Sequence, residues 1–236
     1  MTGQVTNNWI KRLAIAVLFS MAFAYIESAV VVYLRAIFYP DGFTFPLTMF
    51  DLTTLGRRLT VTEIGREAAT LVLIVTAAWL FGGNRQERGA YFLLIFAIWD
   101  IFYYVWLKVL LDWPASIMDW DVLFLIPSVW ASPVLYPVLI SLAMFLFAAA
   151  ILHRSAQRRP LSIKLSDWLG WTAASIVLVV AFCLGGTHIA EPCYREYFYR
   201  SLFGLGYGLS LAVCARALVR SGPSASIEPQ EIATNS

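Results

Sequence analysis

Three carboxylates lie inside apolar stretches that are long enough to span a bilayer: Glu27, Glu67 and Asp100. A charged side chain near the centre of a bilayer costs at least ~2.5–3.5 kcal/mol on insertion scales, so such residues normally face a partner, a cavity or a functional site. A carboxylate there could bind a cation, carry a proton or act as a general acid or base. No other motif in the chain indicates a reaction, so these three acids are the main functional signal.

The first stretch carries a ridge of small residues, Ala16, Ser20 and Ala24, spaced four residues apart. Such a ridge lets another helix approach closely, so Glu27 beside it is expected to point into a helix bundle. Arg35 lies on the same face two turns later. The alternative is a structural role, in which a protonated Glu27 forms a hydrogen bond across a helix contact.

In the second stretch, Thr60 and Glu63 fit a capping box at a helix N-terminus. Glu67 projects from the same face one turn deeper, where capping does not explain it. Arg66 is expected to pair with Glu63 or to extend to the lipid headgroups. Two carboxylates four residues apart could also chelate a divalent metal ion.

The third stretch has the densest polar face, because Tyr103, Tyr104 and Lys108 follow Asp100 at helical spacing. A carboxylate, two phenols and an ammonium group on one face could relay protons or hold a polar ligand. The structural alternative is a hydrogen bond between Asp100 and Tyr104, with Lys108 extending outward to pair with Asp112.

No cofactor can be assigned from the sequence, although a divalent metal fits the acids. The candidate metal ligands are Glu63, Glu67, Asp100 and His188. The chain has only two histidines, and His153 is expected on the opposite side of the membrane from His188, which argues against a bis-histidine haem. Cys183 and Cys193 lie near the same side and could form a disulfide. No nucleic-acid-binding module is present.

These residues must be positioned by membrane helices. Of the 236 residues, 60% are hydrophobic and 14% are charged, which is typical of a polytopic all-α membrane protein. The apolar runs are unbroken and lack the alternation of a β-barrel. They predict a six-transmembrane-helix bundle in one domain, residues 1–220, with spans at about 13–34, 61–81, 90–111, 130–152, 168–186 and 198–217.

The connections predict the orientation of the spans. Lysines and arginines gather near residues 11–12, 85–88, 154–164 and 216–220, which six crossings place on one side. By the positive-inside rule both termini are cytoplasmic, in a cell membrane and most simply a bacterial inner membrane. The polar tail, 221–236, is expected to be a disordered cytoplasmic end.

The segment before the fourth span has an unusual composition. Asp119 and Asp121 flank Trp120, an apolar run follows, and Pro133 and Pro137 then fall within the expected span. This pattern predicts an interfacial or re-entrant segment that leads into a kinked helix, or an ordinary interfacial turn. A kink would free backbone carbonyls and favour a pocket nearby.

Three functions fit this pattern. The first is binding or transport of a cation or small polar solute through an outward-facing pocket, coupled or not to protons, with Glu27, Glu67 and Asp100 converging in space. The second is a membrane-embedded enzyme that acts on a lipid-linked substrate by carboxylate or metal chemistry. The third is a non-catalytic subunit or assembly factor. A homo-oligomer could form through the small-residue faces Gly204/Gly208/Ala212 or Ala16/Ser20/Ala24.

Overall fold

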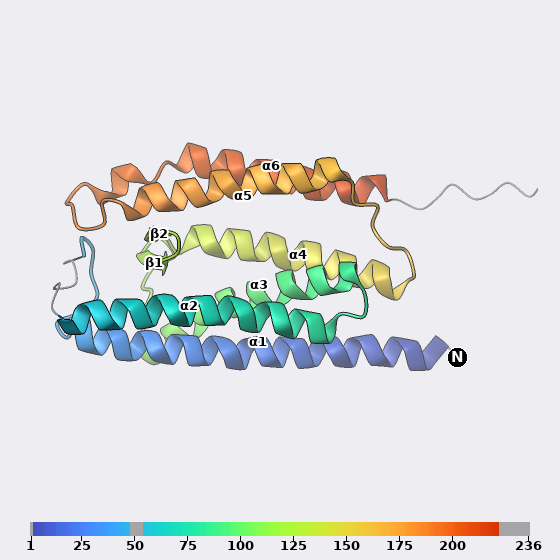
Figure 1. Ribbon diagram of the computed structural model, residues 1–236, viewed down its shortest axis with the longest axis horizontal. Helices are drawn as coiled ribbons and strands as arrows, with labels where there is room; N and C mark the ends of the chain where they lie inside the picture. Colours follow the sequence, from blue (N-terminus) through green and yellow to red (C-terminus); the bar gives the residue numbers. More distant parts are fainter. Residues whose placement is uncertain (1, 48–53, 222–236) are drawn as a thin grey trace, which may run out of the picture.

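The computed structural model describes residues 2–47 and 54–221, which form an all-α bundle with one short β-hairpin (Figure 1). The expected tail from residue 222 onward lies outside the described residues. The elements are α1 (Thr2–Phe38), α2 (Thr54–Phe81), α3 (Arg85–Leu111), β1 (Trp120–Phe124), β2 (Trp130–Pro133), α4 (Leu135–Ala156), α5 (Leu165–Gly186), the 3-10 helix η1 (Tyr194–Tyr197) and α6 (Arg200–Arg220).

Six helices are long and apolar enough to cross a membrane, which confirms the six predicted spans. Their outer faces carry large apolar side chains with high exposure, among them Leu80, Leu165 and Val219. Exposure of this kind would be costly in water but suits a lipid environment. The chain is therefore a multi-pass membrane protein.

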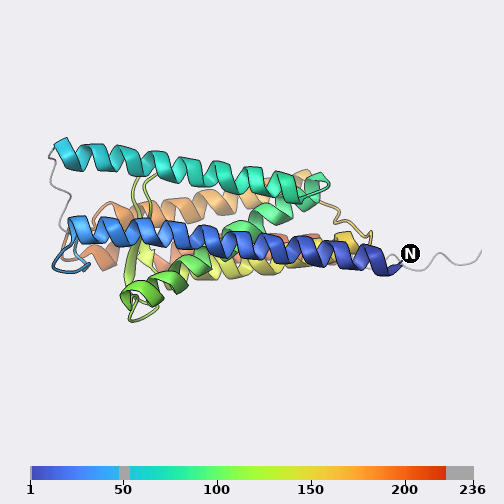
Figure 2. The same cartoon turned by 90° about the horizontal axis from the view of Figure 1, so that it is seen from below.

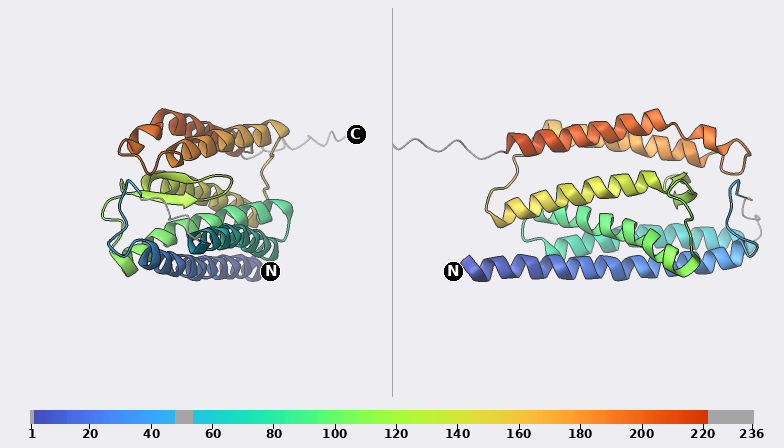
Figure 3. Two further views of the ribbon diagram at one scale, coloured as in Figure 1. Left: turned by 60° about the vertical axis from the view of Figure 1, so that its left-hand side comes forward. Right: turned by 180° about the vertical axis from the view of Figure 1, so that it is seen from behind.

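The helices stack in layers. α3 contacts α1, α2 and α4, whereas α5 and α6 pair with each other and cover the side of α4 and the hairpin (Figures 1 and 3). Both α1 and α6 have their free ends at the same end of the bundle. An apolar core around Ile74, Leu94 and Ile95 fills the half near these ends. A second, aromatic cluster that includes Trp120, Tyr194 and Phe198 fills the half near the hairpin.

The small-residue ridge of α1 is completely buried: Ala16, Ser20 and Ala24 are each 0 % exposed. The hydroxyl of Ser28, one turn further along, donates to the carbonyl oxygen of Tyr103 in α3 at 3.0 Å. The predicted close helix approach is thus a contact with α3 of the same chain. The ridge residues are therefore covered by packing within one copy of the chain.

The segment before α4 is a β-hairpin. β1 and β2 pair antiparallel, with Asp121 opposite Ser132. The fourth helix therefore begins at Leu135 rather than at 130, because residues 130–133 are extended and paired. Pro133 ends β2 and Pro137 lies in the first turn of α4, where no intrahelical N–H is needed. The predicted kink from these prolines is wrong.

The capping box expected at Thr60 and Glu63 is also wrong. α2 begins at Thr54, so Thr60 is already inside the helix. Its hydroxyl donates to the carbonyl oxygen of Gly56 at 2.9 Å. Neither Thr60 nor Glu63 therefore caps the helix, and the Glu63 carboxylate can pair with other residues.

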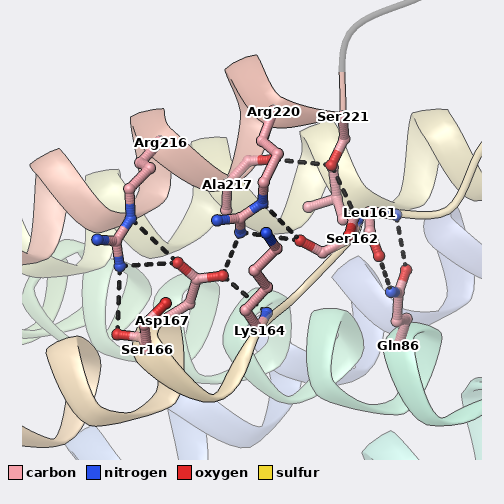
Figure 4. A network of polar contacts seen from close by, with 10 residues as sticks. All are labelled: Gln86, Leu161, Ser162, Lys164, Ser166, Asp167, Arg216, Ala217, Arg220 and Ser221. Carbon is pink, nitrogen blue, oxygen red and sulfur yellow. Dashed lines mark hydrogen bonds and ion pairs between the residues drawn. The ribbon is translucent and has the colours of Figure 1, made fainter. Parts of the chain in front are cut away.

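At the end of the bundle near the termini, Asp167 ties α5 to α6 (Figure 4). It is 0 % exposed, and one oxygen accepts from Arg216 Nη2 at 2.8 Å. The other oxygen accepts from Arg220 and from the backbone N–H of Lys164 at 2.8 Å. Two guanidinium groups and a backbone donor thus compensate this buried carboxylate.

Candidate functional site

A cavity of about 540 Å³ lies among α1–α4 and the hairpin, in the half of the bundle away from the termini. Its size is that of a small-molecule site. Most of its wall is aliphatic or aromatic. The ionisable side chains on the wall are Glu27, Arg35, Tyr39, Glu63, Arg66, Glu67, Asp100, Tyr103, Tyr104 and Asp121. The three intramembrane acids found in the sequence therefore meet in one cavity.

On one side of the cavity, Arg66 joins α2 to α1. Its guanidinium pairs with Glu27 of α1 and with Glu63 on its own helix. The Nε of Arg66 also donates to Glu63 at 2.9 Å. Thr70, one turn deeper, donates to the second oxygen of Glu27 at 3.4 Å. Glu27 and Glu63 thus share one cation, which confirms the expected pair between Arg66 and Glu63.

Glu67 is held by the hairpin instead. It is 6 % exposed, and the backbone N–H of Leu125 donates to its two oxygens at 3.0 and 2.9 Å. Figure 2 shows the hairpin extending across the bundle to α2. No lysine or arginine of the described ranges forms an ion pair with Glu67.

Asp100 faces α4. The hydroxyl of Ser141 donates to its Oδ2 at 2.7 Å. The expected hydrogen bond from Tyr104 to Asp100 does not form; the phenols of Tyr103 and Tyr104 turn to Asp121 in β1. Like Glu67, Asp100 has no cationic partner among the described residues.

Arg35 and Asp121 close the cavity on the hairpin side. Arg35 Nη2 lies 3.2 Å from Asp121 Oδ1. The guanidinium also lies over the rings of Phe43 and Trp113, which stand nearly perpendicular to each other, with each ring centroid 3.9 Å from Cζ. Burial raises the pKa of the Asp121 carboxyl to about 6, although Arg35, the Val122 N–H and the two phenols oppose that rise.

Lys108 does not reach the cavity. Its Nζ pairs with Asp112 at 2.7 Å, and both side chains are at least half exposed. This is the outward arrangement that the sequence offered as the structural alternative. The same ammonium group holds the pKa of Asp112 below its usual value.

The metal candidates do not assemble into a centre. In the described ranges, no group of three His, Cys, Asp or Glu side chains is placed to hold a metal ion. His188 instead pairs with Glu191 through Nδ1 at 2.7 Å, and its ring stacks on Tyr197. Cys183 and Cys193 are free thiols, so the disulfide considered from the sequence is not formed.

The charges on the cavity wall do not balance. Five carboxylates face two guanidinium groups, Arg35 and Arg66. Glu67 and Asp100 are the acids left to hydrogen-bond donors that carry no charge. In a low-dielectric site an unbalanced carboxylate must take up a proton or a cation. The arrangement is therefore chemically suited to bind a cation, to exchange it for protons, or to do both.

Sequence reasoning missed Asp121 as a site residue. In the sequence Asp121 stands out only as a neighbour of Trp120, because the apolar run that follows it is typical of a segment at the membrane interface. Two extended segments around a Pro-Ser pair, residues 120–133, were the available signal for a hairpin. That hairpin brings Asp121 and the Leu125 N–H into the bundle.

No protein-family model, curated protein or solved structure matches this chain.

Proposed function

We propose that this protein binds a cation in the cavity and carries it across the membrane, with Glu67 and Asp100 as the principal ligands. The observation that carries the proposal is that both acids line the cavity while no cationic side chain of the described ranges pairs with them. Acids inside the membrane that lack an ion-pair partner lower the stability of the fold, and at Glu67 the Leu125 N–H and the longer-range charge of Arg66 offset part of this cost.

Proton exchange follows from the same imbalance. Without a cation, the excess carboxylates hold protons, because burial disfavours the charged form. When a cation enters, protons leave. Binding is therefore expected to release protons and to weaken as the pH falls, and the released protons supply a route for coupling.

The location of the cavity sets its access. The lysine and arginine distribution favours cytoplasmic termini, and the cavity lies in the half of the bundle away from the termini. We therefore propose that the cavity opens to the non-cytoplasmic side. We assign the protein to the cell membrane, with the lipid bilayer as its surroundings.

The direct test is binding by the purified protein in nanodiscs, measured by titration calorimetry with a panel of cations in two buffers of different ionisation enthalpy. The difference between the buffers reports proton release. We expect binding with proton release in the wild type and loss of both in the Glu67→Gln, Asp100→Asn double variant. Asp112→Asn is the matched control, because it removes an acid outside the cavity. Equal binding by the wild type and the double variant would refute the proposal.

A second candidate is an enzyme that acts on a lipid-linked substrate, and the aromatic and aliphatic wall of the cavity favours it. A phosphate on such a substrate would need Arg35 or Arg66, yet both already pair with carboxylates. This competition makes catalysis the second choice. A changed lipid profile in cells that lack the protein, restored by the wild type and not by Asp100→Asn, would favour it.

A structural role remains as a third candidate, and one surface suits a second copy or another subunit. Gly204, Gly208 and Ala212 lie on an exposed face of α6, and added Cβ atoms at the two glycines would meet no neighbour. Native mass spectrometry of the wild type and of Gly208→Leu tests whether this face forms an oligomer.

A further inference from the structure

We infer that the ligand of this cavity is an amphipathic organic cation, a molecule with a protonated or quaternary nitrogen on an apolar, ring-sized body. The inference rests on the proposed function and narrows it from cations in general to one chemical class. It is carried by the size of the cavity, the composition of its wall and the way the fold already holds one organic cation.

The size argues against a bare inorganic ion. A cavity of about 540 Å³ is far larger than a coordination shell, in which oxygen ligands stand within ~2.0–2.6 Å of a magnesium or calcium ion. The acids are also fixed to different elements, Glu67 to the hairpin and Asp100 to α4, by their own hydrogen bonds. A larger cation can contact both acids without moving either.

The wall around the two acids is aromatic. Phe92, Phe96 and Trp99 precede Asp100 on α3, and Phe124 and Trp130 face them from the hairpin. Aromatic faces attract a cation by ~0.5–2 kcal/mol each, and they also bury an apolar body. A strongly hydrated ion gains little from such a wall, whereas an organic cation gains from both effects.

Arg35 shows that this end of the fold accommodates an organic cation. Its guanidinium contacts the rings of Phe43 and Trp113, which form a corner around it, and it pairs with the carboxylate of Asp121. The cavity wall carries the same kinds of group, aromatic rings and a carboxylate, among them Trp99, Trp130 and Asp100. Unlike the Arg35 position, it contains no cationic side chain that pairs with the acid in the described part of the chain.

An unpaired indole N–H of Trp99, on the cavity wall, is an independent observation in favour of a bound ligand. The residue is 5 % exposed, and its indole N–H is a buried donor with no hydrogen-bond partner among the described residues. The indole N–H of Trp130 is in the same condition. Buried donors are seldom left unpaired. A hydroxyl, ether or carbonyl oxygen on the ligand would satisfy them after a small rotation of the ring.

The experiment uses a matched pair of probes, phenylbutylammonium and its neutral analogue phenylbutanol, with potassium and magnesium ions as hydrated cations. Binding to the full chain in nanodiscs is measured by calorimetry, with empty nanodiscs as the blank for partition into lipid. We expect saturable binding of phenylbutylammonium that is about tenfold or more tighter than binding of the alcohol. Asp100→Asn and Glu67→Gln should each lower the affinity about tenfold, and Asp112→Asn should leave it unchanged.

The outcomes separate the two proposals. If potassium or magnesium ions bind in an acid-dependent way and phenylbutylammonium does not, the ligand class is wrong and the cation function stands. If the alcohol binds as tightly as the amine, the ligand class is wrong as well. If no cation binds to a wild type that unfolds cooperatively, both proposals are overturned. Thermal unfolding of each variant distinguishes loss of a ligand from loss of the fold.

Discussion

Two buried acidic regions lie at opposite ends of this bundle, and they differ in one respect. At the end near the termini, Asp167 is enclosed by Arg216, Arg220 and a backbone N–H. At the other end, Glu67 and Asp100 meet only uncharged donors. The carboxylate of the first region has ion-pair partners within the chain, whereas the two carboxylates of the second region have none among the described residues. In a membrane protein, the position of an uncompensated charge indicates function better than the position of any charge.

The largest effect is expected from Asp167→Asn, which would remove the paired carboxylate of the first region. The amide leaves two arginines facing a neutral group at a position with no exposed surface, so the free energy of unfolding should fall more than for the other variants. Thermal unfolding in detergent measures the loss. Cation binding by the folded fraction should be unchanged, and a binding defect equal to that of Asp100→Asn would erase the distinction between the two regions.

A smaller effect concerns Asp121, the acid that pairs with Arg35 beside the cavity. Burial raises its pKa from 3.8 to about 6. Because the folded protein holds this proton more tightly than the unfolded chain does, protonation of Asp121 stabilises the fold. This stabilisation is complete below pH 3.8 and is lost as the pH rises through about 6. From about pH 7.5 to about pH 5, the wild type should gain about 1.4 kcal/mol relative to Asp121→Asn. Thermal unfolding of both proteins across that range checks the prediction, and a difference that is constant with pH would contradict it.

Asp100→Asn should have a smaller effect on stability, within about 1 kcal/mol, because the amide oxygen can still accept from Ser141. Removing an uncompensated charge can even stabilise the fold. The same variant should lose cation binding. Asp100→Asn should therefore reduce binding and not stability, whereas Asp167→Asn should reduce stability and not binding. A fall in stability as large as that of Asp167→Asn would show that Asp100 is a structural acid.

The smallest effect is expected at the exposed pair of Lys108 and Asp112. Asp112→Asn should leave the free energy of unfolding nearly unchanged, since exposed ion pairs contribute little. The measurement is again thermal unfolding, at low and high salt. The stability change of Asp112→Asn is the reference with which the changes at the buried acids are compared.

The sequence was sufficient for the six helices and for the meeting of Glu27, Glu67 and Asp100, because long apolar runs and charges within them obey simple energetic rules. It was not sufficient for the hairpin. The strands are only five and four residues long, and their apolar residues resemble an interfacial segment. The partners of Glu67 and Asp121 depend on that hairpin, so they could not be predicted.

The start of α2 was misjudged for a related reason. Thr60 and Glu63 satisfy the local pattern of a helix terminus, yet α2 begins six residues earlier, at Thr54. Local capping patterns describe what a terminus needs and do not exclude a longer helix. The misplacement assigned Glu63 to a cap, whereas the structure places it on the cavity wall beside Arg66.

The packing of the hairpin against α5 limits which substitutions this protein can accept during evolution. Gly185 and Gly186 at the end of α5 leave no room for a side chain, because a Cβ there would collide with the carbonyl oxygens of Ala131 and Val129. Even alanine at Gly186 would displace the hairpin, and with it the N–H that holds Glu67. Ligand preference could thus be altered by a mutation that touches no cavity acid. Two glycines in α5 therefore constrain the drift of a site built mainly by other helices.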